Sequence, residues 1–275
     1  MKKKLKWFSY LNDNPKMLNE YLEYYKVAIY SQSINCPTLE PYLIYDGDNE
    51  EVISFCERKN IKLIKYTPRI KEEVIKHYSV HQPNQVFDAL ACFLKPYVPL
   101  IVKEILKSDD EYVILTDTDV LFLNEPNYTE SNKINFIGVS SEFDINLSDF
   151  NAGIMYFNVE NMYNDLENFE KFIVKNFDKF KVFDQDAFKI YYSDRTKKLP
   201  VGYNYKCYWN YSKPINEIKI LHFHGLKPYQ YMDVLTGKNT NPVLKPMLTP
   251  FYIEMVGYYK GLRDIEKKSY EVLEF

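Results

Sequence analysis

The sequence predicts an α/β fold with a mixed, mostly parallel central sheet and a helical tail at its C-terminal end. Short apolar segments alternate with helical segments over the first 120 residues. This alternation is typical of parallel strands joined by crossover helices. It becomes irregular after residue 120, which indicates a mixed arrangement there. The 275 residues are enough for one large α/β domain or two small ones.

The first half of the chain supplies the alternating segments. Residues 5–11 have the apolar character of a strand, and Pro15 suits the first turn of the helix that follows. A later helical stretch is expected to bend near Pro96 and Pro99, because proline breaks the helical hydrogen bonding. The expected strands are 5–11, 42–45 and 61–66, and the expected helices are 15–34, 50–59 and 84–107.

The second half combines further strands with helices and a tail. Three prolines between residues 242 and 250 precede a final amphipathic helix at about 252–266. Because no internal repeat or low-complexity linker interrupts the chain, we expect a single domain, 1–275, with 241–275 as its helical tail. The expected strands are 134–140, 152–158, 199–203 and 218–223, and the expected helices are 161–178 and 185–192.

Composition and charge argue against several classes of protein. The net charge of −3 and the pI near 5.9 give no indication of nucleic-acid binding. The four cysteines show no Cys-x-x-Cys spacing, which favours a reducing, cytoplasmic location. The basic start of the chain is not followed by an apolar signal segment, and no run approaches the ~18 apolar residues of a membrane span. A peripheral contact of that basic start with an anionic membrane surface stays open.

The run 111–123 contains the most informative pattern of the chain. Asp117 and Asp119 are separated by Thr118 and flanked by apolar segments. A buried carboxylate needs a cation or a metal, and ligand sites of open α/β sheets lie where strands end. The two aspartates are therefore candidate ligands of Mn²⁺ or Mg²⁺. A second Asp-x-Asp, at 46–48, is interpreted as a turn because Gly and Asn adjoin it.

Two further segments carry polar groups at the start of an expected element. Asn151, Ala152 and Gly153 precede an apolar strand, where small residues let a ligand approach the backbone and the Asn amide both donates and accepts. A strand-opening turn is the alternative interpretation. Asp184 and Gln185 stand at an expected helix start, where they either cap the helix or face a polar ligand.

The segment 218–229 combines imidazole, glycine and a cation at the end of an expected strand. His222 and His224 share one face of that strand, because side chains alternate with period two. Gly225 permits a tight turn, and Lys227 brings a cation suited to phosphate. The combination favours His222 as a third metal ligand beside a diphosphate clamp. The His-x-x-x-His spacing at 77–81 lacks the Glu of a zinc hydrolase motif and is interpreted as structural.

In this order the motifs resemble those of family 8 glycosyltransferases, which include glycogenin and bacterial lipopolysaccharide galactosyltransferases. The resemblance covers residues 85–229, and the segments 199–204 and 208–209 look like a related bacterial group. It implies a GT-A fold, a Rossmann-like fold of nucleotide-diphospho-sugar transferases, and retention at the anomeric carbon. The motifs that carry it are Asp117-Thr-Asp119, Asn151-Ala-Gly153, Asp184-Gln185 and His222-Phe-His-Gly-Leu-Lys-Pro228.

The resemblance also implies a role for each matching residue. Asp117, Asp119 and His222 would bind Mn²⁺ or Mg²⁺, and Asp184 and Gln185 would act at the transferred sugar as catalytic residues. It divides the domain into a nucleotide-binding half, 1–120, and a sugar and acceptor half, 121–240. The chain departs from the family at Pro15, where a base-stacking Tyr is usual, and its clamp segment is one residue shorter than in glycogenin. The implied donor-binding residues are Asn12, Lys95, Thr118, Asn151, Ala152, Gly225 and Lys227.

The predicted function is a metal-dependent retaining glycosyltransferase that moves a hexose from a nucleotide sugar, expected to be UDP-linked. The acceptor would be a glycan or a lipid-linked molecule. A sugar-phosphate nucleotidyltransferase is an alternative, but it would carry a Gly-rich signature after the first strand, and residues 11–14 contain no Gly. A non-catalytic nucleotide- or sugar-binding module is the other alternative.

Overall fold

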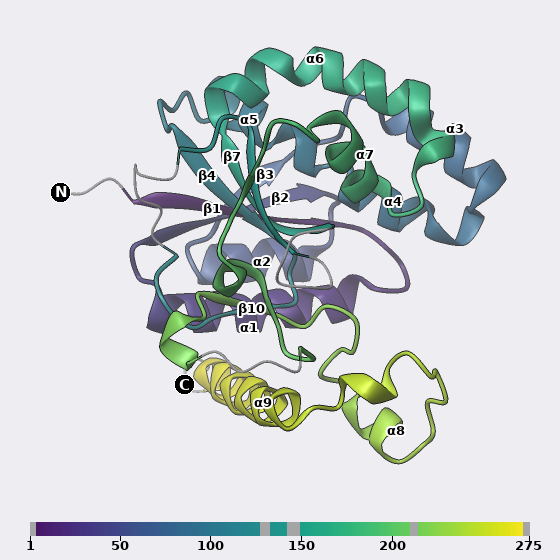
Figure 1. The fold of residues 1–275 in the computed structure, drawn as a ribbon. Coiled ribbons are helices and arrows are strands. Elements are labelled where there is room, and N and C mark those ends of the chain that lie inside the picture. The colour runs from purple at the N-terminus through teal and green to yellow at the C-terminus, as the bar shows by residue number, and fades with distance from the viewer. Residues whose placement is uncertain (1–3, 127–132, 142–148, 210–213, 272–275) are drawn as a thin grey trace. The chain divides into compact units, whose positions relative to one another are not determined.

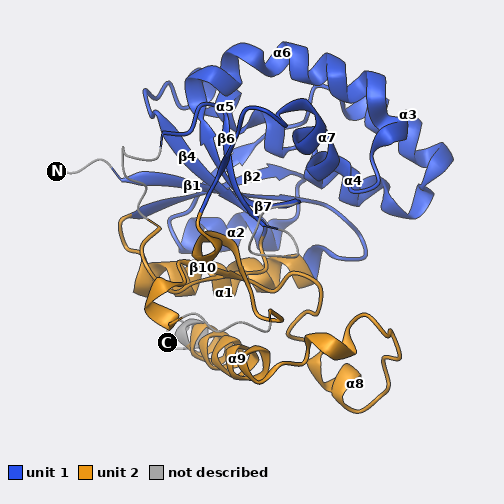
Figure 2. Ribbon diagram, viewed as in Figure 1, with its two compact units in different colours: residues 1–19, 39–117, 128–199 blue, residues 20–38, 118–127, 200–275 orange. Residues whose placement is uncertain are grey.

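The computed structural model describes residues 4–126, 133–141, 149–209 and 214–271 (Figure 1). The chain forms two compact units (Figure 2). Unit 1 contains residues 1–19, 39–117 and 128–199, and unit 2 contains residues 20–38, 118–127 and 200–275. The chain therefore passes from unit 1 into unit 2 between Asp117 and Thr118.

Unit 1 is built on a seven-stranded sheet within the described part of the chain. The strand order is β3-β2-β1-β4-β7-β6-β8. The first four strands in this order run parallel, β7 runs antiparallel to both of its neighbours, and β8 is parallel to β6. The bounds are β1 Leu5–Asn12, β2 Leu39–Asp46, β3 Lys62–Lys65, β4 Tyr112–Thr116, β6 Ile137–Ser141, β7 Phe150–Asn158 and β8 Thr196–Lys198.

Helices cover both faces of this sheet (Figure 1). The core between the sheet and the helices α3 to α7 is apolar and strongly aromatic, with Tyr78, Phe93, Phe169 and Phe188 fully buried. The helix α2 lies on the opposite face of the sheet and buries Val52, Phe55 and Cys56. The bounds are α2 Glu50–Arg58, α3 Lys71–His81, α4 Val86–Cys92, α5 Val98–Leu100, α6 Val159–Asn176 and α7 Phe183–Tyr191.

Unit 2 combines a small sheet with long helices. Its sheet has the order β5-β10-β9. Strand β10 pairs antiparallel with β5 and parallel with β9. An aromatic core that includes Tyr24, Tyr205, Phe223 and Tyr252 joins these strands to α1 and α9. The bounds are α1 Leu18–Asn35, β5 Val120–Phe122, β9 Tyr205–Lys206, β10 Ile220–His222, α8 Tyr231–Leu235 and α9 Pro250–Glu271.

The predicted fold class is confirmed: the central sheet is mixed and mostly parallel, and the chain closes with the helix α9. The stretch expected to bend at its prolines is divided into α4, the 3-10 turn η2 Lys95–Tyr97, α5 and the π-helical η3 Ile101–Ile105. The strand expected at 199–203 is wrong. Instead, the 3-10 turn η6 Val201–Asn204 follows Pro200, and Gly202 lies so close to the carbonyl of Glu217 that no side chain would fit.

One helical stretch, Pro83–Ile105, is long and apolar enough to cross a membrane by length and composition, with a mean hydropathy of 1.4. No such segment was expected from the sequence, in which no run approaches ~18 apolar residues. However, 67% of the apolar window is buried inside the protein, and a core helix passes the same test of length and composition. Within the described residues, the packing of α4 and α5 in the aromatic core of unit 1 explains this apolar composition.

Candidate functional site

The two aspartates of the 111–123 run lie between two strands that belong to different sheets. Strand β4 ends at Thr116, and strand β5 begins at Val120. Asp117 is the last residue of this segment in unit 1, and Asp119 belongs to unit 2. Since consecutive Cα atoms are about 3.8 Å apart, the Cα atoms of the two aspartates lie within ~7.6 Å of each other. The chain itself thus holds the pair together.

Strand register brings the predicted residues of unit 1 to one edge of its sheet. Strands β1 and β4 are parallel, so the residues after their last positions, near Asn12 and Asp117, lie at the same edge. Strand β7 runs the other way, so its first residues, Asn151 and Ala152, reach that edge too. The Asp117 backbone N–H donates to the Gly153 carbonyl at 2.6 Å, which ties these two segments together.

Lys95 is the centre of a buried ionic cluster in unit 1. Its side chain is 4% exposed, and its Nζ lies 3.2 Å from Asp117 Oδ1 and 3.0 Å from Asp184 Oδ2. Nζ also donates to the Ala152 carbonyl at 3.0 Å. The hydroxyl of Tyr10 donates to Asp117 Oδ1. One ammonium thus serves two carboxylates, so the ionised cluster carries excess negative charge.

Burial and neighbouring charges shift the ionisation of this cluster. Burial by itself would lower the pKa of Lys95, but the two carboxylates outweigh it and raise the pKa, so the side chain stays cationic. Burial raises the pKa of Asp184, an effect that Lys95 opposes and Asp117 reinforces. Burial and the charge of Asp117 also raise the pKa of Tyr10, which keeps its hydroxyl protonated as a donor.

Gln185 joins the start of α7 to the start of β7. Its Oε1 accepts from the Ala152 backbone N–H at 3.0 Å and from Asn151 Nδ2 at 3.3 Å. The Asn151 side chain in turn accepts from the Gly153 N–H at 3.0 Å. The sequence proposed either a strand-opening turn or a polar site for these residues. In the structure the amides form one hydrogen-bonded group.

The third residue group of unit 1 surrounds a cavity at the ends of β1 and β2. The cavity has a volume of about 460 Å³, and its lining includes Asn12, Asp13, Asp48 and Phe87. Asn12 Nδ2 donates to the Phe87 carbonyl at 2.7 Å. The Asp13 carboxylate accepts from the Asp48 N–H at 2.7 Å, and Gly47 lies so close to this carboxylate that a Cβ would meet it at 2.4 Å. A turn was predicted at 46–48; in the structure Asp46 ends β2 and the chain bends at Gly47.

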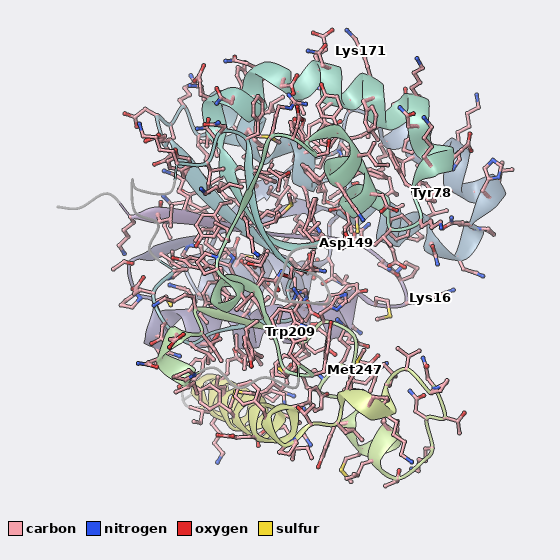
Figure 3. The ribbon with its side chains drawn as sticks, viewed as in Figure 1. Lys16, Tyr78, Asp149, Lys171, Trp209 and Met247 are labelled. Carbon is pink, nitrogen blue, oxygen red and sulfur yellow. The ribbon has the colours of Figure 1, made fainter. Side chains whose placement is uncertain are left out.

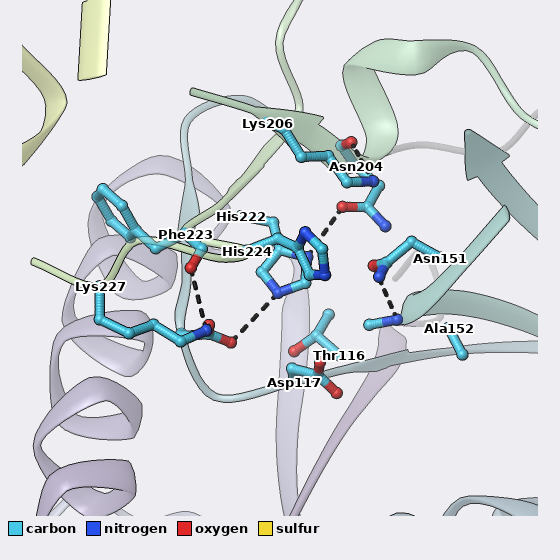
Figure 4. A network of polar contacts seen from close by, with 12 residues as sticks. Thr116, Asp117, Asn151, Ala152, Asn204, Lys206, His222, Phe223, His224 and Lys227 are labelled. Carbon is cyan, nitrogen blue, oxygen red and sulfur yellow. Dashed lines mark hydrogen bonds and ion pairs between the residues drawn. The ribbon is translucent and has the colours of Figure 1, made fainter. Parts of the chain in front are cut away.

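In unit 2, the antiparallel pairing of β5 and β10 brings Asp119 to His222. His222 pairs with Val120, and the Phe223 N–H donates to the Asp119 carbonyl at 3.0 Å. The side chains then lie beside each other, with His222 Nε2 3.3 Å from Asp119 Oδ1. Lys227 Nζ contacts the other oxygen of Asp119 and donates to the Phe223 carbonyl at 3.0 Å (Figure 4).

Asp119 stays ionised in this environment. Burial would raise its pKa, but Lys227 and His222 together outweigh burial and hold the pKa well below its ordinary value. The residue is 6% exposed, so its charge depends on these partners. A buried carboxylate beside an imidazole and an ammonium is a set of groups that can hold a cation and an anionic ligand together.

Asn204 orients the His222 ring from the side opposite Asp119. Its Oδ1 lies 3.1 Å from His222 Nδ1 (Figure 4). When Nδ1 is protonated it donates to this oxygen, and Nε2, which faces Asp119, is then the ring nitrogen that can bind a cation. Asn204 belongs to the segment 199–204, which resembles a related bacterial group of glycosyltransferases, but no role was predicted for it.

His224 is not part of the same contact with Asp119. Its Nδ1 lies 3.0 Å from the Tyr208 hydroxyl, and burial with the nearby His222 and Lys206 lowers its pKa to about 2. The ring is therefore neutral. Lys206, fully buried next to it, donates to the Asn204 carbonyl at 3.2 Å and lies 5.2 Å from the centre of the Trp209 ring.

The backbone of the predicted clamp has the conformation that glycine allows. Gly225 has φ +83°, and a Cβ at this position would meet Met247 Sδ at 2.7 Å. Both the φ value and the close approach exclude a larger residue without local rearrangement. Gly225 thus permits the turn that follows β10 and leads to Lys227.

The structure distributes the predicted site residues between two groups, one in each unit, and leaves Asn12 in the cavity of unit 1. Thr118 lies at the passage between the units and is 7% exposed. Sequence reasoning missed Tyr10, Asn204 and Tyr208, of which the last two lie in segments quoted for their resemblance. The unit 1 group contains Lys95, Asp117, Asn151, Ala152, Asp184 and Gln185, and the unit 2 group contains Asp119, His222, Gly225 and Lys227.

No family model matches this sequence, and no curated protein matches it. Solved structures match its fold. Among them is the apo form of the glycosyltransferase GlyE of Streptococcus pneumoniae TIGR4, with a TM-score of 0.60 and 14% identity over 94% of this chain. This chain spans 64% of that GlyE chain.

Two shorter glycosyltransferases are similar over nearly their whole length. The galactosyltransferase LgtC, solved in complex with donor and acceptor sugar analogs, has a TM-score of 0.60 and 16% identity over 89% of this chain and 100% of its own. Mouse xyloside xylosyltransferase 1 has a TM-score of 0.54 and 14% identity over 81% of this chain and 98% of its own. The chain has the GT-A fold of these glycosyltransferases, as the resemblance of its motifs implied.

Proposed function

We propose that the protein is a metal-dependent retaining glycosyltransferase that transfers a hexose from a nucleotide sugar, UDP-linked, to a glycan or lipid-linked acceptor. The observation that carries the proposal is the group of Asp119, His222 and Lys227 in unit 2, joined through the chain to Asp117. Oxygen and imidazole ligands beside a lysine suit a divalent cation that accompanies a diphosphate. The GT-A fold supports the same reaction class.

The donor set fits Mn²⁺ or Mg²⁺. Asp117, Asp119 and His222 would hold the ion, and the contact of Asn204 with His222 Nδ1 directs Nε2, on the Asp119 side of the ring, toward it. When bound, such an ion stabilises the negative charge that develops on the departing nucleoside diphosphate. Lys227 would exchange its contact with Asp119 for the diphosphate, and the turn at Gly225 allows the backbone to approach it.

The groups of unit 1 would bind the rest of the donor. Asn12 and the cavity of about 460 Å³ at the ends of β1 and β2 suit a nucleoside, since the cavity combines polar groups with the partly exposed ring of Phe87. Asn151, Ala152 and Gln185 would line the transferred sugar with amide groups, which hydrogen bond to hydroxyls. Lys95 would hold Asp117 and Asp184 in place through its ion pairs with both carboxylates.

The contacts of Asp184 support attack of the acceptor from the leaving-group face. A double displacement would need a nucleophile beneath the sugar ring. Asp184 is 3% exposed and paired with Lys95, and Gln185, an amide, is a poor nucleophile. In the proposed reaction Gln185 therefore stabilises the positively charged sugar through its carbonyl oxygen, and Asp184 adds negative potential beneath it.

The decisive experiment is a screen of UDP-, GDP- and CMP-sugars for metal-dependent release of the nucleotide. Asp119→Ala and His222→Ala are expected to abolish Mn²⁺-dependent turnover, because each removes a proposed ligand. Asp194→Ala is the matched control, since it removes a carboxylate that is 84% exposed and contacts Arg195. Near-normal turnover in either ligand variant would reject the metal assignment, and release of pyrophosphate from a nucleoside triphosphate would favour the nucleotidyltransferase.

A further inference from the structure

A second group of potential metal ligands lies in unit 1, on the helix α3 and the 3-10 turn η5 Phe177–Lys179 that follows α6. It consists of His77, His81 and Asp178. The sequence gives no metal motif here, since no Glu follows His77 as in zinc hydrolases. The fold supplies what the local sequence lacks, a carboxylate from a segment about a hundred residues later.

The spacing of the three side chains is close to the spacing of ligands around a small divalent ion. His77 and His81 are four residues apart on one face of α3, and their ring centres are 4.6 Å apart. His77 Nδ1 lies 3.9 Å from Asp178 Oδ1, and the three ligand atoms lie within 4.8 Å of one another. Two ligands that each lie ~2.1 Å from a zinc ion are at most about 4.2 Å apart. A small rotation of the exposed His81 would therefore complete the set.

One ligand of the three is already held in position. The His77 ring stacks on Phe177 at 5.1 Å and packs against the edge of Tyr78 at 5.0 Å, and its side chain is 17% exposed (Figure 3 labels Tyr78). Asp178 is 86% exposed, so the group opens to solvent, which can supply the remaining ligands as water. A fixed imidazole with two adjustable partners costs less conformational entropy on binding than three free side chains.

We propose that His77, His81 and Asp178 bind a late first-row divalent cation, with Zn²⁺ as the representative ion, in a structural site of unit 1. Two imidazoles and one carboxylate suit Zn²⁺ better than the hard ions Mg²⁺ or Ca²⁺. The bound ion would fasten α3 to η5. Tyr78, next to His77, also packs against Phe183 at the start of α7, so the ion would stabilise the region that precedes Asp184 and Gln185. This site does not depend on the proposed transferase function.

The first test observes the histidines directly, because the chain has four. The ring nitrogens of the full-length protein are followed by two-dimensional NMR during titration with Zn²⁺, with His81→Gln used to assign signals. Shifts of the His77 and His81 signals that saturate together would support the site. If these two signals stay unchanged while those of His222 or His224 saturate, or if no histidine signal moves, the proposal is wrong.

The second test measures affinity by competition with a chromophoric zinc chelator. Loss of a residue that only hydrogen bonds to a metal ligand lowers metal affinity by about 10- to 100-fold. His81→Gln and Asp178→Asn each remove a direct ligand and should therefore weaken Zn²⁺ binding at this site at least ~tenfold. Asp194→Asn, another exposed carboxylate of unit 1, is the control and should leave the affinity unchanged. Both substituted positions are exposed, so the variants should fold. Equal affinity in Asp178→Asn and the wild type would overturn the three-ligand site.

Discussion

At the scale of single residues, each buried charge in the two site groups has a partner of opposite sign. Asp119 pairs with Lys227, and Lys95 lies between Asp117 and Asp184. Burial without such partners would cost several kcal/mol per ion. We therefore expect a single substitution in one of these ion pairs to lower stability as well as binding, because it leaves a buried charge without its partner.

Asn204 offers a test in which binding changes without loss of a proposed ligand. Because its Oδ1 faces His222 Nδ1, Asn204→Ala should leave the ring free to adopt the other tautomer and orientation. We expect the affinity for Mn²⁺ to fall by about 10- to 100-fold, as is usual when a hydrogen-bond partner of a ligating histidine is lost, while turnover recovers at high Mn²⁺ concentration. The measurement is nucleotide release against Mn²⁺ concentration.

The control for Asn204→Ala is Asn204→Asp, which keeps an oxygen in place of the amide oxygen and should retain the affinity for Mn²⁺. An activity loss in Asn204→Ala that no Mn²⁺ concentration restores would mean that Asn204 acts on folding or on the sugar rather than through His222.

Gln185 tests the chemistry at the sugar. We expect Gln185→Ala to lower kcat by about 10²- to 10³-fold while the Kd for the nucleoside diphosphate changes little, because the carbonyl oxygen would act on charge that develops during transfer. The readout is kcat from initial rates beside Kd from calorimetry. An unchanged kcat would remove Gln185 from the chemistry, and a matched fall in affinity would give it a binding role instead.

At the scale of elements, strand register positions the site more directly than any single motif does. Pairing of His222 with Val120 brings Asp119 next to the imidazole, and the antiparallel entry of β7 delivers Asn151 to the edge where β4 ends. A shift of one residue in either ladder would turn these side chains to the opposite face. The pairing of the short strands β5 and β10 therefore determines which side chains meet at the site.

Two glycines with similar φ angles allow the effect of backbone strain to be measured separately from the effect of a steric clash. Gly225 and Gly237 have φ +83° and +77°, and a Cβ would meet Met247 Sδ at Gly225 but no atom within 4 Å at Gly237 (Figure 3 labels Met247). Both Gly→Ala variants should lose about 1–2 kcal/mol of unfolding free energy from the left-handed conformation. Gly225→Ala alone should also weaken nucleoside diphosphate binding. Equal diphosphate affinity in the two variants would exclude Gly225 from the clamp.

The elements that sequence reasoning found are those with strong periodicity. Strands β1 and β2 and helices α1 and α2 appear within a few residues of their expected positions. The helix α3 was not expected, because it buries little more than Val74 and Tyr78 and so has a weak apolar pattern. The prediction of a strand at 199–203 failed because the close approach of Gly202 to the Glu217 carbonyl, in the region of the 3-10 turn 201–204, is a tertiary contact that the local sequence does not indicate.

At the scale of the whole molecule, the residue types of the site could be predicted from the sequence, but their distribution between two compact units could not. Asp117 and Asp119 were expected at the end of one strand, whereas the chain leaves one sheet at β4 and enters another at β5. Residue spacing alone does not reveal such a change, because β5 has three residues and its partner β10 is about a hundred residues away. His222 was predicted from the combination of His, Gly and Lys at the end of a strand, with the resemblance of motifs as support, and in the structure its Nε2 lies 3.3 Å from Asp119 Oδ1.

The stereochemistry of the product tests the proposed reaction as a whole. If the acceptor attacks from the leaving-group face, the new glycosidic bond should have the anomeric configuration of the donor, which proton NMR of the product reads from the anomeric coupling constant. An enzyme that used Asp184 or another carboxylate as a base for water or acceptor on the opposite face would invert this configuration. Because Asp184 is buried and paired with Lys95, we expect retention, together with residual transfer in Asp184→Asn. Inversion in the wild type would reject the retaining mechanism while leaving the GT-A fold and the metal ligands unaffected.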